Sequence, residues 1–250
     1  MKRIGKLILL ALSVSVLNGC TMKNIEAQAY AVSMGMDLTE NGQISVSVQV
    51  PALSQSGGGG GESGGGSEGD EYTFSQAEGD TLTAALEMLN AGVPRELNLT
   101  GVKTVVVSET LAKSERFMEV LEEMALAYRV YGAAEMVVCI GEAGEFIQNQ
   151  KPVIGLRLSE SMAVALSHYQ EYGYVPSAKA ADMFYISRSY YGDPVAILAA
   201  GGGIAAQEEG QGADSYADTL PDTGQKQNRY FGTALFSEGK MTGRLTGIQT

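Results

Sequence analysis

The chain has 250 residues, of which 44% are hydrophobic and 18% charged, and its formal net charge is −12. This composition is typical of one or two globular domains, and it argues against nucleic acid as a partner because phosphate binding needs clustered Lys and Arg. With one His and two Cys, we expect no metal site, no cofactor and no disulfide scaffold. No catalytic motif stands out, so the sequence predicts a protein that is not an enzyme.

The N-terminus has the form of a secretory leader. A basic start over residues 1–6 precedes an apolar run over residues 7–17, which is too short for an ordinary membrane span. Residues 17–20 read Leu-Asn-Gly-Cys and resemble a bacterial lipobox, in which cleavage precedes the Cys and its sulfur receives diacylglycerol. We therefore predict a signal peptide over residues 1–19 and lipidation of Cys20. An ordinary signal peptide followed by a chance cysteine is the alternative.

Lipidation would make membrane lipid a partner of the chain through acylated Cys20. Loss of the leader leaves 14 basic and 29 acidic residues. A chain this acidic should not adhere to anionic lipid through its own surface, so the acyl chains must provide the anchor. The apolar neighbours of the second cysteine, Cys139, predict a buried and inert thiol.

The first half of the mature chain begins with a hairpin. Asn41-Gly42 separates apolar-rich runs over residues 30–38 and 43–50, which is the strongest short hairpin signal. The second run alternates apolar residues with Ser and Gln, so we expect a strand with one buried face. The Gly-rich, acidic segment 54–70 lacks the Gly-Lys-Ser/Thr of a phosphate loop and predicts a flexible hairpin loop.

Strands and helices then follow one another as far as residue 147. The expected elements are a strand over 72–74, a helix capped by Asp80 or Thr81, strands over 97–99 and 102–107, a helix over 109–127 capped by Ser108, a strand over 135–140 and a helix over 141–147. In the helix over 109–127, core packing is expected for Met118, Leu121, Met124, Leu126 and Tyr128.

The remaining segments complete an α+β fold, a mixed sheet with flanking helices. The expected elements are a helix over 160–172, a helix over 178–190 capped by Ser177, a strand over 195–199, a Gly-rich and acidic linker over 201–228 and a β-hairpin over 229–250. Two strands alone are marginally stable, so this hairpin either docks on the first domain or begins a second, incomplete domain.

Half of the twelve tyrosines fall between residues 169 and 191. Tyr is enriched where one end of a side chain is buried and the other is hydrated, as at interfaces. One interpretation is that these residues pack two helices onto the sheet. The other is contact with a partner protein, for which the candidates are Tyr169, Tyr172, Tyr174, Tyr190 and Tyr191.

Several segments, in this order, carry a resemblance to a known family. They are Leu17–Cys20, Met34–Asp37, Ile44–Pro51, Gly79 with Thr81, Leu82 and Ala85, Pro94–Leu99 with Lys103, Ser108–Lys113, Arg129, Cys139–Ala143, and Gly232–Phe236 with Lys240, Gly243 and Leu245. Together they resemble the Ger(x)C family, the lipoprotein C subunits of nutrient germinant receptors in endospore-forming bacteria. The acidic residue that usually accompanies Arg129 is missing.

The resemblance implies a non-enzymatic, lipid-anchored subunit on the outer face of the cell or spore inner membrane. It would act in nutrient-triggered spore germination with A-type and B-type germinant receptor membrane subunits. The family's N-terminal domain would cover residues 20–200, and the hairpin over 229–250 would begin a truncated second domain. A solute-binding lipoprotein of the cell envelope is the alternative, and a cell-envelope hydrolase is a third possibility.

Overall fold

The computed structural model describes residues 27–51, 72–126, 130, 132–150, 158–189, 192–201 and 228–246. Several sequence-based expectations lie outside these residues. They concern the leader with Cys20, the Gly-rich segment, almost all of the linker, Tyr128, Tyr190 and Tyr191.

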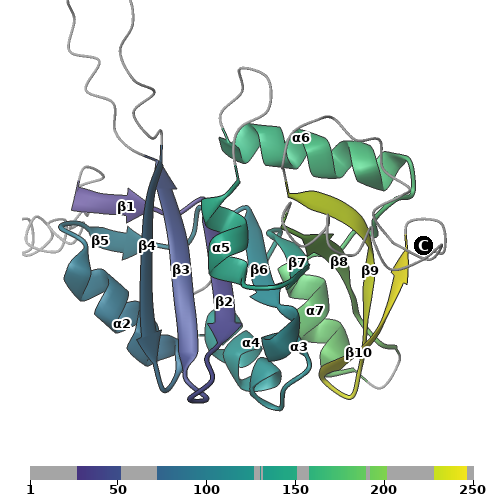
Figure 1. Cartoon of the computed structure of the whole chain (residues 1–250), viewed down its shortest axis with the longest axis horizontal. Helices are drawn as coiled ribbons and strands as arrows, with labels where there is room; N and C mark the ends of the chain where they lie inside the picture. Colours follow the sequence, from purple (N-terminus) through teal and green to yellow (C-terminus); the bar gives the residue numbers. More distant parts are fainter. Residues whose placement is uncertain are drawn as a thin grey trace, which may run out of the picture.

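An eight-stranded mixed sheet forms the centre of the molecule (Figure 1). In spatial order its strands are β10 (Lys240–Thr246), β9 (Arg229–Ser237), β8 (Val195–Ala200), β7 (Glu135–Ile140), β6 (Thr104–Ser108), β2 (Ser33–Leu38), β3 (Ile44–Pro51) and β4 (Tyr72–Gly79). The four central strands are parallel, and the outer strands pair antiparallel on both sides. A separate parallel pair joins β1 (Gln28–Tyr30) to β5 (Glu96–Asn98). The predicted α+β fold with a mixed sheet is confirmed.

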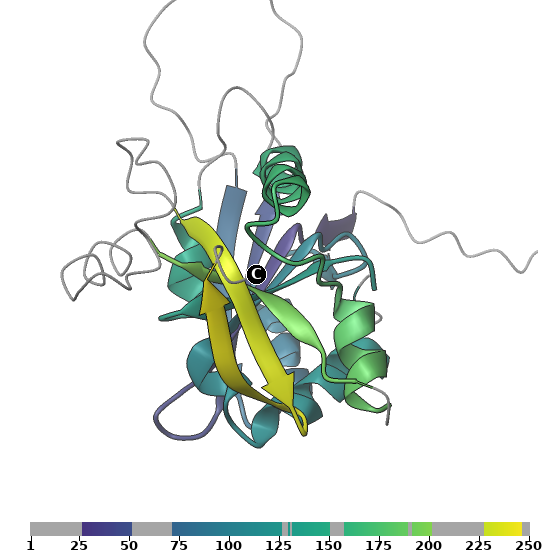
Figure 2. The same ribbon diagram turned by 90° about the vertical axis from the view of Figure 1, so that its right-hand side faces the viewer.

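Helices cover both faces of the sheet. We call the face that buries the larger hydrophobic cluster the major face and the opposite face the minor face, and the two clusters are named in the same way. The major face packs against α2 (Leu82–Gly92), α3 (Glu109–Ala112), α4 (Arg116–Leu126) and α7 (Ala180–Ser187). The minor face packs against α5 (Ala143–Gln148) and α6 (Leu158–Glu171). Figure 2 shows α6 nearly end-on above the sheet, with α5 and α7 on opposite sides.

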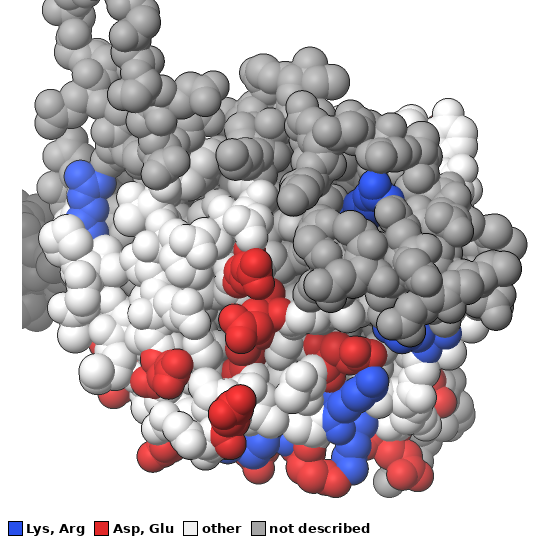
Figure 3. Space-filling view, in the orientation of Figure 1, with Lys and Arg blue, Asp and Glu red and all other residues white. Residues whose placement is uncertain are grey.

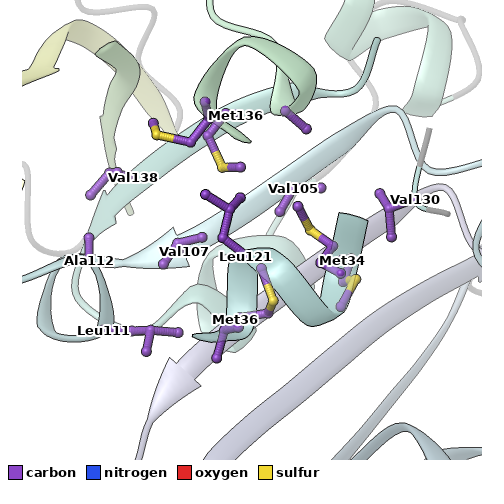
Figure 4. Packing of buried hydrophobic residues seen from close by; sticks show 14 of the residues in the cluster. Met34, Met36, Val105, Val107, Leu111, Ala112, Leu121, Val130, Met136 and Val138 are labelled. Atoms are coloured by element: carbon purple, nitrogen blue, oxygen red, sulfur yellow. The ribbon is translucent and has the colours of Figure 1, made fainter. Parts of the chain in front are cut away.

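The central strands send successive side chains into opposite clusters, as the two-residue period of a strand requires. In β6, Val105 and Val107 enter the major cluster while Val106 enters the minor one. Figure 4 shows Leu121 of α4 among residues of the major cluster, including Met36 of β2. Burial on both faces explains why these strands read as continuous apolar runs in the sequence.

Both predicted hairpins are present. Gly42 in the β2–β3 turn has a φ of 80°, and its N–H donates to the carbonyl of Thr39. In the β9–β10 turn, Glu238 and Gly239 both have positive φ, as a type I′ turn requires. Because β9 pairs antiparallel with β8, the C-terminal hairpin docks on the sheet and forms one of its edges.

The single helix expected over residues 109–127 is instead two helices, α3 and α4. Ser108 caps α3 as predicted, accepting the N–H of Leu111. Ser114 then closes a turn, because both its N–H and its hydroxyl donate to the Leu111 carbonyl. The expectation that Leu126 packs in the core was wrong, since this side chain is 66% exposed.

Two further boundaries differ from the sequence-based expectation. Lys179, and not Ser177, is the N-cap of α7. The carbonyl of Ala178 accepts a hydrogen bond from the N–H of Met136. Because this bond holds the backbone before α7 against β7, the helix begins only at Ala180. The strand expected over 72–74 extends to Gly79, because β4 pairs with β3 along its whole length.

Candidate functional site

A group of polar contacts lies where the parallel strands β2 and β6 end. We call it the Asp37 joint, because it links Asp37 to Ser108 and to the first residues of α5. Asp37 in β2 accepts hydrogen bonds from the N–H groups of Ala143 and Gly144, at 2.7 and 2.9 Å, where α5 begins. The Ser108 hydroxyl also donates a hydrogen bond to this carboxylate. Desolvation raises the pKa of Asp37 and outweighs the three hydrogen bonds, which lower it. The joint therefore fastens α5 to the sheet through a buried carboxyl group.

Gly35 allows α5 to approach the sheet closely. A Cβ at this position would lie 2.5 Å from Ser47 Oγ and 3.1 Å from the backbone of Ala143. The segment Met34–Asp37 thus combines room for a helix with a cap for that helix. The sequence resemblance singled out this segment, and the structure gives it a packing role.

A second segment of the resemblance also acts in packing. A Cβ at Gly79 would lie 2.5 Å from the backbone nitrogen of Ala85 in α2. Thr81 caps the same helix, as predicted, by accepting the N–H of Ala84 at 3.1 Å. Gly79 and Thr81 therefore seat α2 directly after β4.

The polar side of β3 is buried, which corrects the expectation of a strand with one buried face. Ser45, Ser47 and Gln49 are only 3%, 1% and 4% exposed. Ser45 Oγ accepts a hydrogen bond from Gln76 Nε2 at 2.8 Å. Ser47 Oγ and Gln49 Oε1 are buried without a hydrogen-bond partner within the described part of the chain. At Ser47 the cover is α5, since a Cβ on Gly144 would lie 3.4 Å from Ser47 Oγ, and the Asp37 joint holds that helix in place.

The chemistry available in the described residues is limited. They contain no group of three His, Cys, Asp or Glu side chains placed to hold a metal ion. Cys139 is fully buried, as predicted, and burial raises its pKa well above the ordinary value. Such a thiol is a poor nucleophile. Its closest polar contact is the Gly141 carbonyl, 3.5 Å away.

The candidate tyrosines have different surroundings. Tyr169 is half-buried in the minor cluster, with its ring centroid 6.4 Å from that of the buried Tyr230. Tyr230 anchors the hairpin, because its ring contacts Phe146 of α5 and its hydroxyl accepts the Gln150 amide at 2.7 Å. Tyr169 therefore packs against the minor cluster. Tyr174 is also half-buried.

Tyr172 is the first residue after α6, and its N–H donates to the His168 carbonyl of the last helical turn. Its side chain is 64% exposed and contacts the ring of His168, one turn earlier, at a centroid distance of 4.7 Å. Val164, one further turn back, is 59% exposed. The spacing of four residues places all three side chains on one face of the helix.

A second exposed aromatic residue lies on α7. Tyr185 is 71% exposed, and its ring contacts that of Phe184. Tyr185 lies within the Tyr-rich stretch over residues 169–191 but is not among the five candidates for partner contact. Its exposure could not be read from the sequence, because the pattern of α7 does not separate Tyr185 from its buried neighbour Phe184.

Charged side chains are unevenly distributed on the face seen in Figure 3. Acidic groups run down its middle, and acidic and basic groups mix along its lower margin. Elsewhere among the described residues charged side chains form ion pairs, including Lys113 with Glu109 at 2.7 Å and Arg188 with Glu122 at 2.5 Å. Exposed pairs of this kind contribute about 0–1 kcal/mol each. This face therefore offers an acidic strip to its surroundings.

The mixed sheet with helices on both faces defines an α+β domain. Gly35, Asp37, Gly79 and Thr81, which belong to segments of the resemblance, position the helices on this sheet. Residues 21–200 match the family model described as "Spore germination protein N-terminal domain". The chain belongs to this family of spore germination proteins. The family match ends with β8, so the docked β9–β10 hairpin lies beyond it.

Two further comparisons were made. No curated protein matches the chain. Among solved structures, the chain is similar to "Crystal Structure of the GerBC protein", with 16% sequence identity and a TM-score of 0.30. The similarity covers 85% of this chain and 51% of that one, so the chain spans about half the length of GerBC.

No helix within the described ranges is both long enough and apolar enough to cross a membrane.

Proposed function

We propose that the chain is a lipid-anchored lipoprotein subunit of a spore germinant receptor, acting in nutrient-triggered germination with A-type and B-type membrane subunits. The observation that carries this proposal is the position of the family match. It begins at residue 21, directly after Cys20, the last residue of the lipobox-like sequence. The predicted signal peptide therefore ends, and the family domain begins, at the position where a mature lipoprotein would start. Residues 1–19 would be removed, and residues 20–200 would form the N-terminal domain.

The anchor would hold the domain close to the bilayer. Each buried CH₂ of an acyl chain contributes about 0.8 kcal/mol, and two chains are enough for stable binding. Cys20 precedes the first described residue, Ala27, by seven residues. A fully extended segment of this length spans at most about 25 Å. The end of the domain that carries β1 would therefore lie near the membrane.

Membrane fractionation of two cysteine variants tests the anchor. Cys20→Ser should move the protein from the membrane fraction to the soluble fraction. Cys139→Ser is the matched control, because it also removes a thiol but leaves the lipid site in place, so it should stay with the membrane. A Cys20→Ser variant that remains membrane-bound would contradict lipid anchoring.

For assembly with the membrane subunits, we propose a surface that includes Tyr172. Its exposure directly after α6, on the same side as the exposed Val164, leaves it available for a partner, whereas Tyr169 packs against Tyr230. Tyr174, Tyr190 and Tyr191 remain candidates for the same surface. Tyr172→Ser should reduce recovery of the membrane subunits in a pull-down without lowering the Tm. Tyr169→Ser should lower the Tm, and unchanged recovery with Tyr172→Ser would count against this surface.

We propose a role in assembly and not in catalysis. The two buried reactive groups are engaged in structure, Asp37 as a helix cap and Cys139 within the minor cluster. The alternative is a solute-binding lipoprotein, and such proteins usually have two comparable lobes around a cleft. The described residues instead form one unit built on the eight-stranded sheet.

A further inference from the structure

The two edges of the main sheet differ in how they guard against strand addition. Proteins commonly protect edge strands with charges, Pro or bulges, because an edge strand exposes unpaired N–H and C=O groups. The edge strand β10 has an irregular register between Met241 and Gly243, and it carries Lys240 and Arg244. At the opposite edge, β4 has none of these features except one charged residue, Glu78.

The geometry of β4 suits the addition of another strand. Its eight residues pair with β3 in an unbroken register, from Tyr72 opposite Pro51 to Gly79 opposite Ile44. In the described part of the chain, β3 is the only strand that pairs with β4. Alternate backbone groups of an antiparallel strand point to opposite edges, so about four N–H and four C=O groups of β4 point away from β3.

The side chains of β4 leave this edge open to solvent. Thr73, Gln76 and Glu78 are exposed, and the residues between them are half-buried. In Figure 1, β4 lies at the margin of the sheet opposite the hairpin, with α2 behind it on the major face. The centre of the strand carries no charge, which suits an extended segment held mainly by backbone hydrogen bonds.

Acidic groups gather at the end of β4 and favour a basic partner. Glu78 and Asp80 are exposed there, and Gln43 Nε2 donates to Asp80 Oδ1, which brings the β2–β3 turn alongside. The basic residue Arg116 also lies at this end, but its guanidinium already donates hydrogen bonds to the carbonyls of Gly42 and Asp80 and to the Glu119 carboxylate. A second copy of this chain, with a net charge of −12, would be repelled.

We propose that β4 binds an extended segment of a partner protein as an added strand of the sheet, with a neutral centre and with Lys or Arg residues at the end that meets Glu78 and Asp80. Backbone hydrogen bonds would provide affinity, and the flanking charges would provide orientation and selectivity. This binding does not depend on receptor assembly or on Tyr172. Its test uses one purified protein and a peptide, so its failure is distinguishable from failure of membrane co-purification.

The first test measures peptide binding by fluorescence anisotropy with the full chain in detergent. The probe is an alternating Thr-Val peptide between paired Lys residues. We expect saturable binding, at least roughly tenfold weaker binding of the Glu-flanked version, and no binding of a version with alternate N-methylated amides. Undiminished binding of the N-methylated peptide, or light scattering that shows a dimer of the chain, would overturn the proposal.

Variants of β4 provide the second test. The N–H groups of Ser75 and Gln76 point to opposite edges, so Ser75→Pro and Gln76→Pro should differ in Tm, with the outward-facing change tolerated. The tolerated variant should lose peptide binding by at least roughly tenfold, and full retention would refute docking at this edge. Glu78→Lys changes an exposed charge without touching the backbone. It should weaken binding of the Lys-flanked peptide, and no change would contradict the proposed selectivity.

Discussion

The two faces of the central sheet are built differently. The cluster of the major face includes buried apolar residues of every strand of the main sheet from β3 across to β10, and of four helices. The minor face is apolar over β6 to β9 but polar over β2 and β3, where Ser47 and Gln49 are buried beneath α5. The comparison indicates that the major face supplies most of the hydrophobic stabilisation. The minor face holds its short helix with specific polar contacts.

The polar half of the minor face carries an energetic cost. A buried polar atom without a partner costs about 1–3 kcal/mol, and both Ser47 Oγ and Gln49 Oε1 are in this condition. We therefore expect substitutions on the major face to have larger effects on stability than those on the polar half of the minor face.

Phe117→Ala should have the largest effect. Phe117 of α4 is 1% exposed, and its ring centroid lies 5.1 Å from that of Phe236 in β9. Removing a buried aromatic ring leaves a cavity, and the expected loss in the free energy of unfolding is about 3–5 kcal/mol. Urea denaturation followed by circular dichroism measures it. A loss below about 1 kcal/mol would contradict the leading role of the major face.

Gly35→Ala should have the next largest effect, because the new Cβ would collide with Ser47 Oγ and the Ala143 backbone. Overpacking of this kind costs about 1–3 kcal/mol. Gly92→Ala is the matched control, since nothing lies within 4 Å of a Cβ at this helical position. The control should be neutral or slightly stabilising. Equal effects of both substitutions on the free energy of unfolding would show that α5 does not need close approach to β2.

The ionisation of Asp37 predicts a pH dependence. Because burial raises its pKa above the ordinary value of 3.8, the folded state binds this proton more tightly than the unfolded state. Its contribution to stability is fully present below pH 3.8 and is lost as the pH rises through the folded-state pKa. The free energy of unfolding of the wild type minus that of Asp37→Asn should therefore fall as the pH rises from 3.8. A difference that grows over this range would mean that the three hydrogen bonds outweigh desolvation.

The smallest expected effect comes from two neighbouring serines of β3. Ser47→Ala removes an unpaired buried hydroxyl and should be neutral or stabilising. Ser45→Ala removes the acceptor of the Gln76 amide and should cost about 0.5–1.5 kcal/mol. Chemical denaturation of both variants compares them directly. The reverse order would indicate that Ser47 Oγ has a partner in solution.

Local signals in the sequence were sufficient for most of the elements. Asn41-Gly42 predicted the first hairpin because its turn needs a residue with positive φ, and Ser108 and Thr81 predicted helix starts because their side chains accept backbone N–H groups. The alternation in β3 predicted the faces of the strand correctly but not their burial. Burial depends on α5, which the Asp37 joint brings from more than a hundred residues away in the chain.

The candidate surface was harder to predict than the fold. Tyr169 in α6 and Tyr172 just after it are three residues apart, yet Tyr169 packs on Tyr230 and Tyr172 is exposed. The difference arises from the docked hairpin, which supplies Tyr230 to the minor cluster. Composition alone indicated where tyrosines gather but not which of them the tertiary structure leaves available.

Mass spectrometry of the mature N-terminus tests the proposed anchor most directly. The protein would be purified from membranes and digested, and its N-terminal peptide analysed. We predict that this peptide begins at Cys20 and carries a diacylglyceryl group on its sulfur. An intact leader, a different first residue or an unmodified Cys20 would contradict the account of a lipid-anchored receptor subunit.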